Sequence, residues 1–108
     1  MKQKIANFLN IDIEDLKEIT NLQKQFLREN HSNLYQMPVF YTDEYIIFGS
    51  ESAMKHWQYY VGFEYLPDPE IMKRDNDFIA AYSIYNDRDD RVQIILDELE
   101  EANNQQPE

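Results

Sequence analysis

The sequence contains no cysteine, only two glycines and no long apolar segment. Without cysteine there is no disulfide framework, thiolate metal site or cysteine nucleophile. Two glycines are too few for a glycine-rich phosphate loop or a nucleophile elbow. No run approaches the roughly 18–20 apolar residues of a membrane span. Asn7, Asn10 and Asp12 interrupt the apolar start, so no signal-peptide core is expected. We therefore expect a soluble, cytoplasmic protein.

Basic residues are scarce in the last two-thirds of the chain. Residues 1–40 balance five Lys or Arg against five Asp or Glu, whereas residues 41–108 carry five basic and sixteen acidic groups. The second part therefore supplies the whole formal charge of −11. This excess repels itself, and it attracts basic surfaces over a Debye length of about 8–10 Å. It disfavours direct binding to nucleic acid or to anionic membranes.

The length and composition predict one globular domain. Hydrophobic residues make up 43% of the 108 residues, too many for a disordered acidic chain. We predict a domain over residues 1–102 and a frayed acidic tail over residues 103–108. The predicted fold class is α+β and predominantly helical, with a two-stranded β-hairpin packed on four or five helices. The aromatic and β-branched runs at residues 39–41 and 45–48 predict that hairpin.

Apolar spacing and capping residues indicate the first three helices. A short helix is expected over residues 1–9, and a longer one from about residue 10 to residue 28. A third follows the hairpin, with Ser50 or Ser52 as its N-cap and Gly62 at its end.

The segment after residue 67 is open to two interpretations. Asp68-Pro69-Glu70 offers an N-cap, a proline at the first helical position and an acidic first turn, so we predict a helix from there. Phe78–Tyr85 would lie on that helix. The same aromatic and β-branched stretch is also compatible with a strand.

The last helix is predicted to begin at Asn86 or Asp87 and to bury Val92, Ile95, Leu96 and Leu99. Its end, residues 97–101, carries four carboxylates at the negative end of the helix dipole, with no nearby Lys or Arg. Each carboxylate costs about 0.3–1 kcal/mol at low salt. Two explanations stay open: a solvated face that keeps the protein soluble, or a face held for a basic partner.

The spacing along this helix gives the second explanation a geometry. Residues four apart advance about 6 Å along a helix, comparable to the gap between neighbouring phosphates. Asp90, Asp97, Glu100 and Glu101 would then form a phosphate-like row. In size and charge the chain resembles small acidic nucleic-acid mimics, such as phage antirestriction and anti-CRISPR proteins. The resemblance implies a protein that occupies the cationic groove of a nucleic-acid-binding enzyme.

We predict a partner-binding surface of carboxylates and of tyrosines in excess of what one small core needs. The predicted contact residues are Glu64, Asp68, Glu70, Asp75, Asp77, Asp87, Asp89, Asp90, Asp97, Glu98, Glu100, Glu101, Tyr35, Tyr59 and Tyr65.

No motif predicts catalysis, and we expect the protein not to be an enzyme. His31 and His56 have no sequence neighbours that complete a triad, and paired carboxylates are too plentiful to single out. An enzyme would require a deep pocket that gathers His31 or His56 with a carboxylate.

No metal or other cofactor is expected. Asp87, Asp89 and Glu98 match three positions of an EF-hand loop, but Arg91 and Val92 stand where the loop needs a ligand and a glycine.

The predicted function is a small acidic inhibitor that binds a basic protein, in particular a nucleic-acid-binding enzyme. One alternative is an immunity or antitoxin protein that neutralises a basic toxic enzyme. Another is a small structural or adaptor subunit, including a homodimer joined along the hairpin edge.

Overall fold

A five-stranded antiparallel sheet forms the centre of the fold, so the predicted two-stranded hairpin on a mainly helical body is wrong. The computed structural model describes residues 2–85 and 88–104. The strands have the spatial order β1-β2-β3-β5-β4. They are β1 Lys17–Glu18, β2 Phe40–Tyr41, β3 Tyr45–Phe48, β4 Glu70–Arg74 and β5 Asp77–Ser83. The class is α+β.

Four α-helices accompany the sheet in the described ranges: α1 Lys2–Leu9, α2 Asn21–Asn30, α3 Glu51–Val61 and α4 Arg91–Asn104. Three short 3-10 helices connect them: η1 Ile13–Asp15, η2 Phe63–Tyr65 and η3 Arg88–Asp90. None of the helices in these ranges has the length and apolar character needed to cross a membrane.

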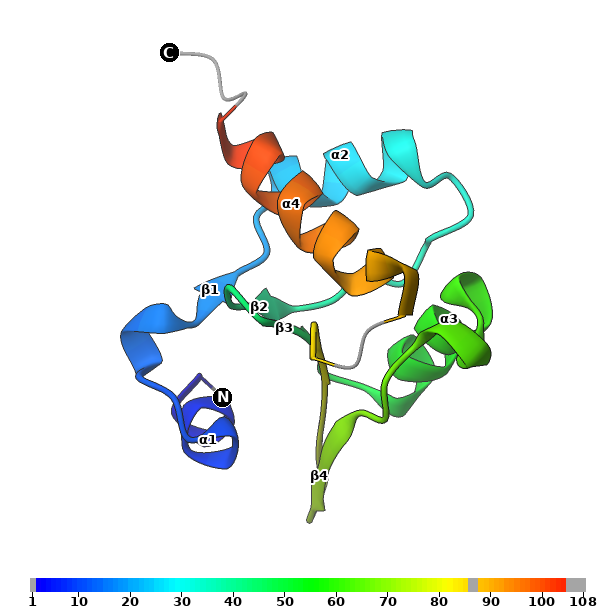
Figure 1. The fold of residues 1–108 in the computed structure, drawn as a ribbon. Coiled ribbons are helices and arrows are strands. Elements are labelled where there is room, and N and C mark those ends of the chain that lie inside the picture. Colours follow the sequence, from blue (N-terminus) through cyan, green and yellow to red (C-terminus); the bar gives the residue numbers. More distant parts are fainter. Residues whose placement is uncertain (1, 86–87, 105–108) are drawn as a thin grey trace.

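Helices cover both faces of the sheet. Figure 1 shows α2 and α4 above strands β1–β3, and α1 below them. The alternation of side chains along β3 divides the core accordingly. Ile46 and Phe48 face a core that includes Trp57 of α3 and buried residues of α2 and α4. Ile47 faces a second core that includes Ile5 of α1.

The long helix predicted over residues 10–28 is also wrong, because the chain there forms η1, β1 and α2. Asn10 has a left-handed backbone, with φ 56°, immediately after α1. A capping box then starts α2: the Thr20 hydroxyl accepts from the Gln23 backbone N–H, and the Gln23 side-chain oxygen accepts from the Thr20 backbone N–H. The apolar residues of the predicted stripe are therefore divided between η1, the positions that flank β1, and α2.

The helix predicted from Asp68-Pro69-Glu70 is wrong as well, and the strand interpretation of the following segment is confirmed by β5. β4 and β5 form a hairpin in which Arg74 lies opposite Asp77. The two-residue turn between them contains Asp75 with φ 55°, as tight hairpin turns require. β5 lies between β3 and β4, which explains its run of buried residues.

Several other predictions are confirmed. The first helix is α1, and β2 and β3 pair as predicted. The Ser50 hydroxyl caps α3 by accepting from the Ala53 N–H, and Gly62 follows the last residue of α3 with φ 102°. A Cβ at Gly62 would lie 3.1 Å from the Tyr65 ring, so both backbone and space favour glycine there.

The last helix buries the predicted residues Val92, Ile95, Leu96 and Leu99. Its predicted start at Asn86 or Asp87 lies outside the described residues. α4 itself begins at Arg91 and continues to Asn104, so it includes the first part of the predicted tail. Residues 105–108 lie outside the described ranges.

Candidate functional site

The carboxylates of α4 point in three directions around the helix. Glu98 is half-buried and faces the end of α2, where its Oε2 lies 2.5 Å from Nε2 of His31. Glu100 faces β1, where the Lys17 ammonium donates to its Oε1 at 2.8 Å. Asp97 and Glu101 are exposed on the outer side. Glu98 and Glu100 therefore contact basic groups of α2 and β1, whereas Asp97, which accepts from the Gln93 amide at 2.9 Å, and Glu101 lie on the side of α4 that is exposed to solvent.

His31 links three helices through its two ring nitrogens. It is the C-cap residue of α2, and its Nδ1 lies 2.6 Å from the hydroxyl of Tyr60 in α3. When Nε2–H donates to the Glu98 carboxylate, Nδ1 of the neutral ring accepts from the Tyr60 hydroxyl. The result is a carboxylate–imidazole–phenol chain that ties α4 to α2 and α3.

This chain gathers His31 with a carboxylate, but the groove beside it is open and Glu98 does not line it, so the deep pocket that an enzyme would require is not formed by these residues. Burial raises the pKa of Tyr60, and the charge of Glu98 raises it further. The phenol is thus held in its protonated, hydrogen-bond-donating form. An activated tyrosine nucleophile would need the opposite shift. The contacts are therefore suited to holding the helices together more than to covalent catalysis.

Two adjoining grooves flank Tyr60. The first, of about 570 Å³, runs between α4 and the end of α3; it is lined by His31, Tyr60, Val61, Asp89, Arg91, Ile94 and Ile95. The second, of about 730 Å³, is lined by Ser32, Asn33, Tyr35, His56, Tyr59 and Tyr60. Together they form a partly aromatic depression beside the outer face of α4.

Two of the three predicted tyrosines lie on this depression. Tyr35 and Tyr59 are 70% and 84% exposed. The Tyr35 ring packs on His56 with centroids 4.0 Å apart, which fixes its orientation. Tyr65 differs: it is half-buried, and the Arg91 guanidinium lies 3.9 Å from its ring centroid. Tyr65 therefore helps to hold Arg91, which also donates to the Val61 carbonyl at 3.1 Å.

Asp89 and Asp90 precede α4 in η3 and are exposed. Both have left-handed backbones, with φ 61° and 53°. They therefore add exposed negative charge directly before α4 without belonging to the helix. Asp87 lies outside the described residues.

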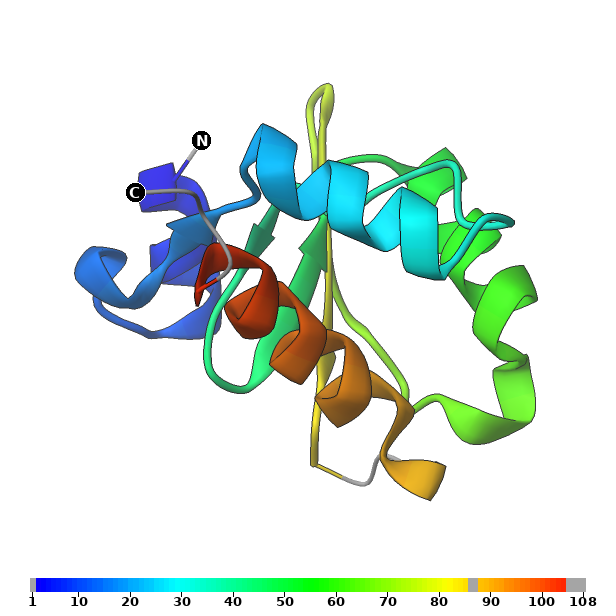
Figure 2. The ribbon, with the colours of Figure 1, turned by 90° about the horizontal axis from the view of Figure 1, so that it is seen from above.

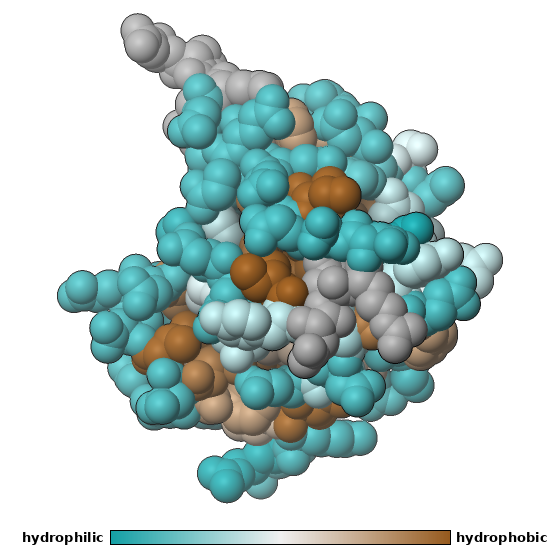
Figure 3. Space-filling model, in the orientation of Figure 1, coloured by the Kyte–Doolittle hydropathy of each residue, from teal (hydrophilic) through white to brown (hydrophobic). Residues whose placement is uncertain are grey.

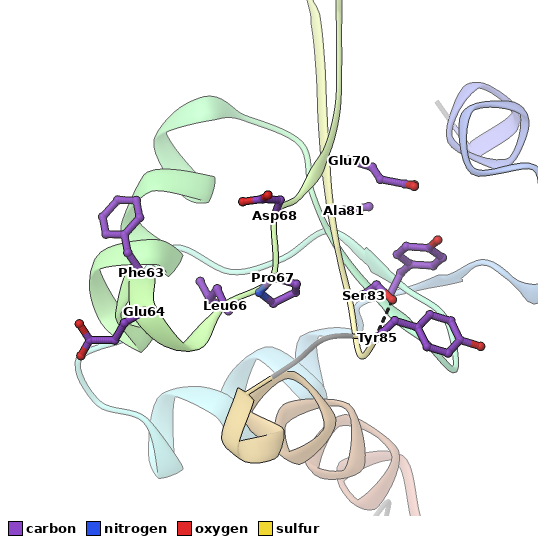
Figure 4. Close-up of a pocket in the computed structure, with 10 residues that line it drawn as sticks. Phe63, Glu64, Leu66, Pro67, Asp68, Glu70, Ala81, Ser83 and Tyr85 are labelled. Atoms are coloured by element: carbon purple, nitrogen blue, oxygen red, sulfur yellow. Dashed lines mark hydrogen bonds between the residues drawn. The ribbon is translucent and has the colours of Figure 1, made fainter.

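A second acidic group lies elsewhere, at the entry to the β4–β5 hairpin. Glu64, Asp68 and Glu70 line a pocket of about 530 Å³ together with Tyr45 and six other residues. Figure 4 shows Asp68 and Glu70 pointing to opposite sides of the hairpin. Burial raises the pKa of Tyr45, and the nearby charge of Glu70 adds to the shift.

The remaining predicted carboxylates lie at the hairpin tip. Asp75 occupies the turn, and Asp77 forms an ion pair with Lys4 of α1 at 2.5 Å. The Lys4 ammonium lowers the pKa of Asp77 below its ordinary value. The predicted acidic residues therefore divide among three places: the α4 face, the hairpin entry and the hairpin tip.

The sequence analysis missed Tyr60, Ile94 and the juxtaposition of Glu98 with His31. Ile94 is 48% exposed in the middle of the acidic face of α4. Its only signal in the sequence is an apolar residue outside the buried spacing of that helix. Figure 3 shows the surface over α4 as largely hydrophilic, with small hydrophobic patches.

Within the described ranges, no three His, Asp or Glu side chains are arranged to hold a metal ion. Comparisons with protein-family models, with curated proteins and with solved structures give no match. The chemistry of the site is therefore interpreted from its own geometry.

Proposed function

We propose that the protein is a small, acidic, non-enzymatic inhibitor that binds a basic, nucleic-acid-handling protein. The binding surface is the outer face of α4 with the depression beside it. One observation carries the proposal: Asp97 and Glu101 are exposed one turn apart on α4, the exposed Ile94 lies on the same face, and the exposed Asp90 directly precedes the helix. Carboxylates near the C-terminal end of α4 are unfavourable, because they face the negative end of the helix dipole. A role in binding would explain why the chain carries them there.

The spacing of these carboxylates suits cationic groups that normally hold phosphates. Asp97 and Glu101 are one turn apart on α4, about 6 Å. Such charges mainly accelerate encounter and favour basic partners. Tyr35, Tyr59 and Ile94 supply the apolar area that excludes water from the charge pairs.

We place this activity in the cytoplasm. The chain has no cysteine, so its folding does not require the oxidising compartments in which disulfides form. The target is expected to be a protein that uses the same Lys and Arg groups to bind nucleic acid. Binding should weaken as salt rises, because the attraction between exposed charges is screened.

The test neutralises the exposed charges with amides and keeps the carboxylates that contact His31 and Lys17. The variant Asp90→Asn, Asp97→Asn, Glu101→Gln leaves Glu98 with His31 and Glu100 with Lys17. Wild type and variant are immobilised at low salt, exposed to lysate of the organism that encodes the chain, and eluted with a salt gradient for mass spectrometry. The expected result is capture of a basic, nucleic-acid-binding protein by the wild type and at least about tenfold weaker capture by the variant.

A matched control carries the same three chemical changes at the opposite end of the chain. Asp12→Asn, Glu14→Gln and Asp15→Asn all alter exposed residues in or beside η1. The control is expected to capture the same protein as the wild type. Equal losses in both variants would contradict the proposal, because net charge alone would then explain the binding. Capture of a toxic enzyme encoded beside this chain would instead favour the antidote function.

A further inference from the structure

β4 is an edge strand that projects from the body of the protein. Figures 1 and 2 show the β4–β5 hairpin extending beyond the surrounding helices. β4 pairs with β5 along one side, and no strand of the described part of the chain pairs with its other side. Such an edge presents backbone N–H and C=O groups to any strand that can pair with it.

We propose that this edge pairs with the β4 edge of a second copy of the chain. The two strands would run antiparallel about a two-fold axis at Met72. The β2–β3 hairpin edges considered in the sequence analysis cannot serve, because β1 and β5 already occupy them. The proposal does not depend on the inhibitor function, since the α4 face takes no part in it.

Charge complementarity selects the register. Pairing centred on Met72 uses all five residues of β4 and places Glu70 opposite Arg74 of the second copy. Directly opposed residues of an antiparallel pair lie on the same face and close enough to interact. A register centred on Lys73 would instead oppose two ammonium groups. One centred on Ile71 would leave both Lys73 and Arg74 outside the paired region.

The structure leaves both charges available for this contact. Neither Glu70 nor Arg74 has an ion pair within the described residues, and both are exposed. Met72 packs on the α1 side of the sheet. Glu70, Met72 and Arg74 are every second residue of β4, so their side chains point to the same side of the sheet.

The acidic pocket at the hairpin entry lies where the second copy's hairpin tip would arrive. Glu70, Asp68 and Glu64 line it, and no Lys or Arg does (Figure 4). In the two-fold arrangement each tip lies beside the other copy's hairpin entry. The Arg74 guanidinium of each copy therefore meets the Glu70 side of this pocket, and the contact occurs twice.

On the other side of the sheet, the proposed pairing would cover the exposed side chain of Ile71. Ile71 is 48% exposed in the single chain. In the proposed register Lys73 of the second copy lies opposite Ile71, and its methylene groups cover the isoleucine while its ammonium stays near Glu51 of its own chain, 3.6 Å away. The paired area is small beside the roughly 1,200–2,000 Å² of a stable interface. The dimer is therefore weak and forms with rising protein concentration.

The experiment is sedimentation equilibrium of the full chain across a wide range of protein concentration, with a charge swap. Glu70→Arg and Arg74→Glu each place like charges opposite one another, and each is expected to weaken the dimer at least about tenfold. The double variant, Glu70→Arg with Arg74→Glu, restores the pairing with its signs reversed. It is expected to recover most of the wild-type association.

The charge-matched control, Glu14→Arg, changes an exposed residue away from β4 and should dimerise like the wild type. Circular dichroism verifies that each variant is folded. A wild type that stays monomeric at every concentration overturns the proposal, as does a double variant that remains as weak as the single ones. Because the α4 face is untouched, failure here leaves the proposed inhibitor function standing, and the reverse also holds.

Discussion

Nε2 of His31 lies 2.5 Å from Oε2 of Glu98, a contact between residues 67 positions apart. It joins the end of α2 to the middle of α4, and the other ring nitrogen reaches Tyr60 in α3. The His31 and Glu98 side chains are only 19% and 24% exposed, so water has limited access to replace either partner. The orientation of the outer face of α4 therefore depends on this contact.

Removing the Glu98 carboxylate should destabilise the fold. Glu98→Leu leaves the half-buried His31 N–H without an acceptor, so the free energy of unfolding should fall by about 1–3 kcal/mol. Glu98→Gln keeps a side-chain oxygen in place and should cost less than about 1 kcal/mol. Urea denaturation followed by circular dichroism measures both values. Equal losses would show that charge, and not the hydrogen bond, dominates this contact.

Gln23 is the fully buried polar side chain that joins α2 to α4 and the sheet. Its amide nitrogen donates to the Tyr41 hydroxyl at 3.0 Å and to the Leu99 carbonyl at 2.9 Å, and its oxygen accepts from the Thr20 N–H. Gln23→Leu removes all three hydrogen bonds, including the side-chain half of the capping box, whereas the backbone N–H at position 23 can still donate to the Thr20 hydroxyl. The free energy of unfolding should fall by about 2–4 kcal/mol.

An exposed glutamine on the same helix provides the comparison for this substitution. The Gln25 side-chain amide donates to Glu29 at the surface, at 3.2 Å. Gln25→Leu should change the free energy of unfolding by no more than about 0.5 kcal/mol in the same urea experiment. Similar effects at both positions would mean that the buried hydrogen bonds of Gln23 add nothing beyond helix propensity.

Tyr82 makes the fold sensitive to alkaline pH. Burial raises its pKa from an ordinary value of 10.0 to about 12. The unfolded chain therefore loses the phenolic proton first, so the stabilisation is complete below pH 10 and is lost as the pH rises towards 12. Gln58 also donates to this hydroxyl at 2.6 Å.

Tyr82→Phe tests this pH dependence. At neutral pH the variant should be less stable by about 0.5–1.5 kcal/mol, since the bond from Gln58 is lost. Between pH 10 and 12 the free energy of unfolding should fall more steeply for the wild type than for the variant. Parallel curves across that range would contradict the assignment to Tyr82.

Capping residues and apolar spacing predicted α3 and the buried face of α4 correctly. Ser50 and Gly62 bracket α3, and the apolar spacing of α4 survives in its buried face. The predictions were wrong where the same short stretch of sequence is compatible with both a helix and a strand. Asp68-Pro69-Glu70 has the composition of a helix start, yet it leads into a strand because β5 pairs with both β3 and β4. The Thr20–Gln23 capping box was present in the sequence and would have placed the start of α2.

The candidate site was less accessible to prediction, because its key contacts join residues far apart along the chain. Charge counting found the carboxylates of α4 but could not tell which of them contact His31 or Lys17. That division follows from how α2 and β1 pack against α4. Tyr35 and Tyr59 were predictable as surplus aromatics, whereas the exposure of Ile94 follows from the rotation of α4 about its axis.

Trp57 is the single tryptophan of the chain, and it is fully buried between α3 and the sheet, with its ring centroid 5.6 Å from that of Phe48. Its intrinsic fluorescence therefore originates at one known place, the seam where α3 meets β3. Emission should move to longer wavelength when that seam admits water. The protein thus carries its own optical reporter, with no label or engineered fluorophore required.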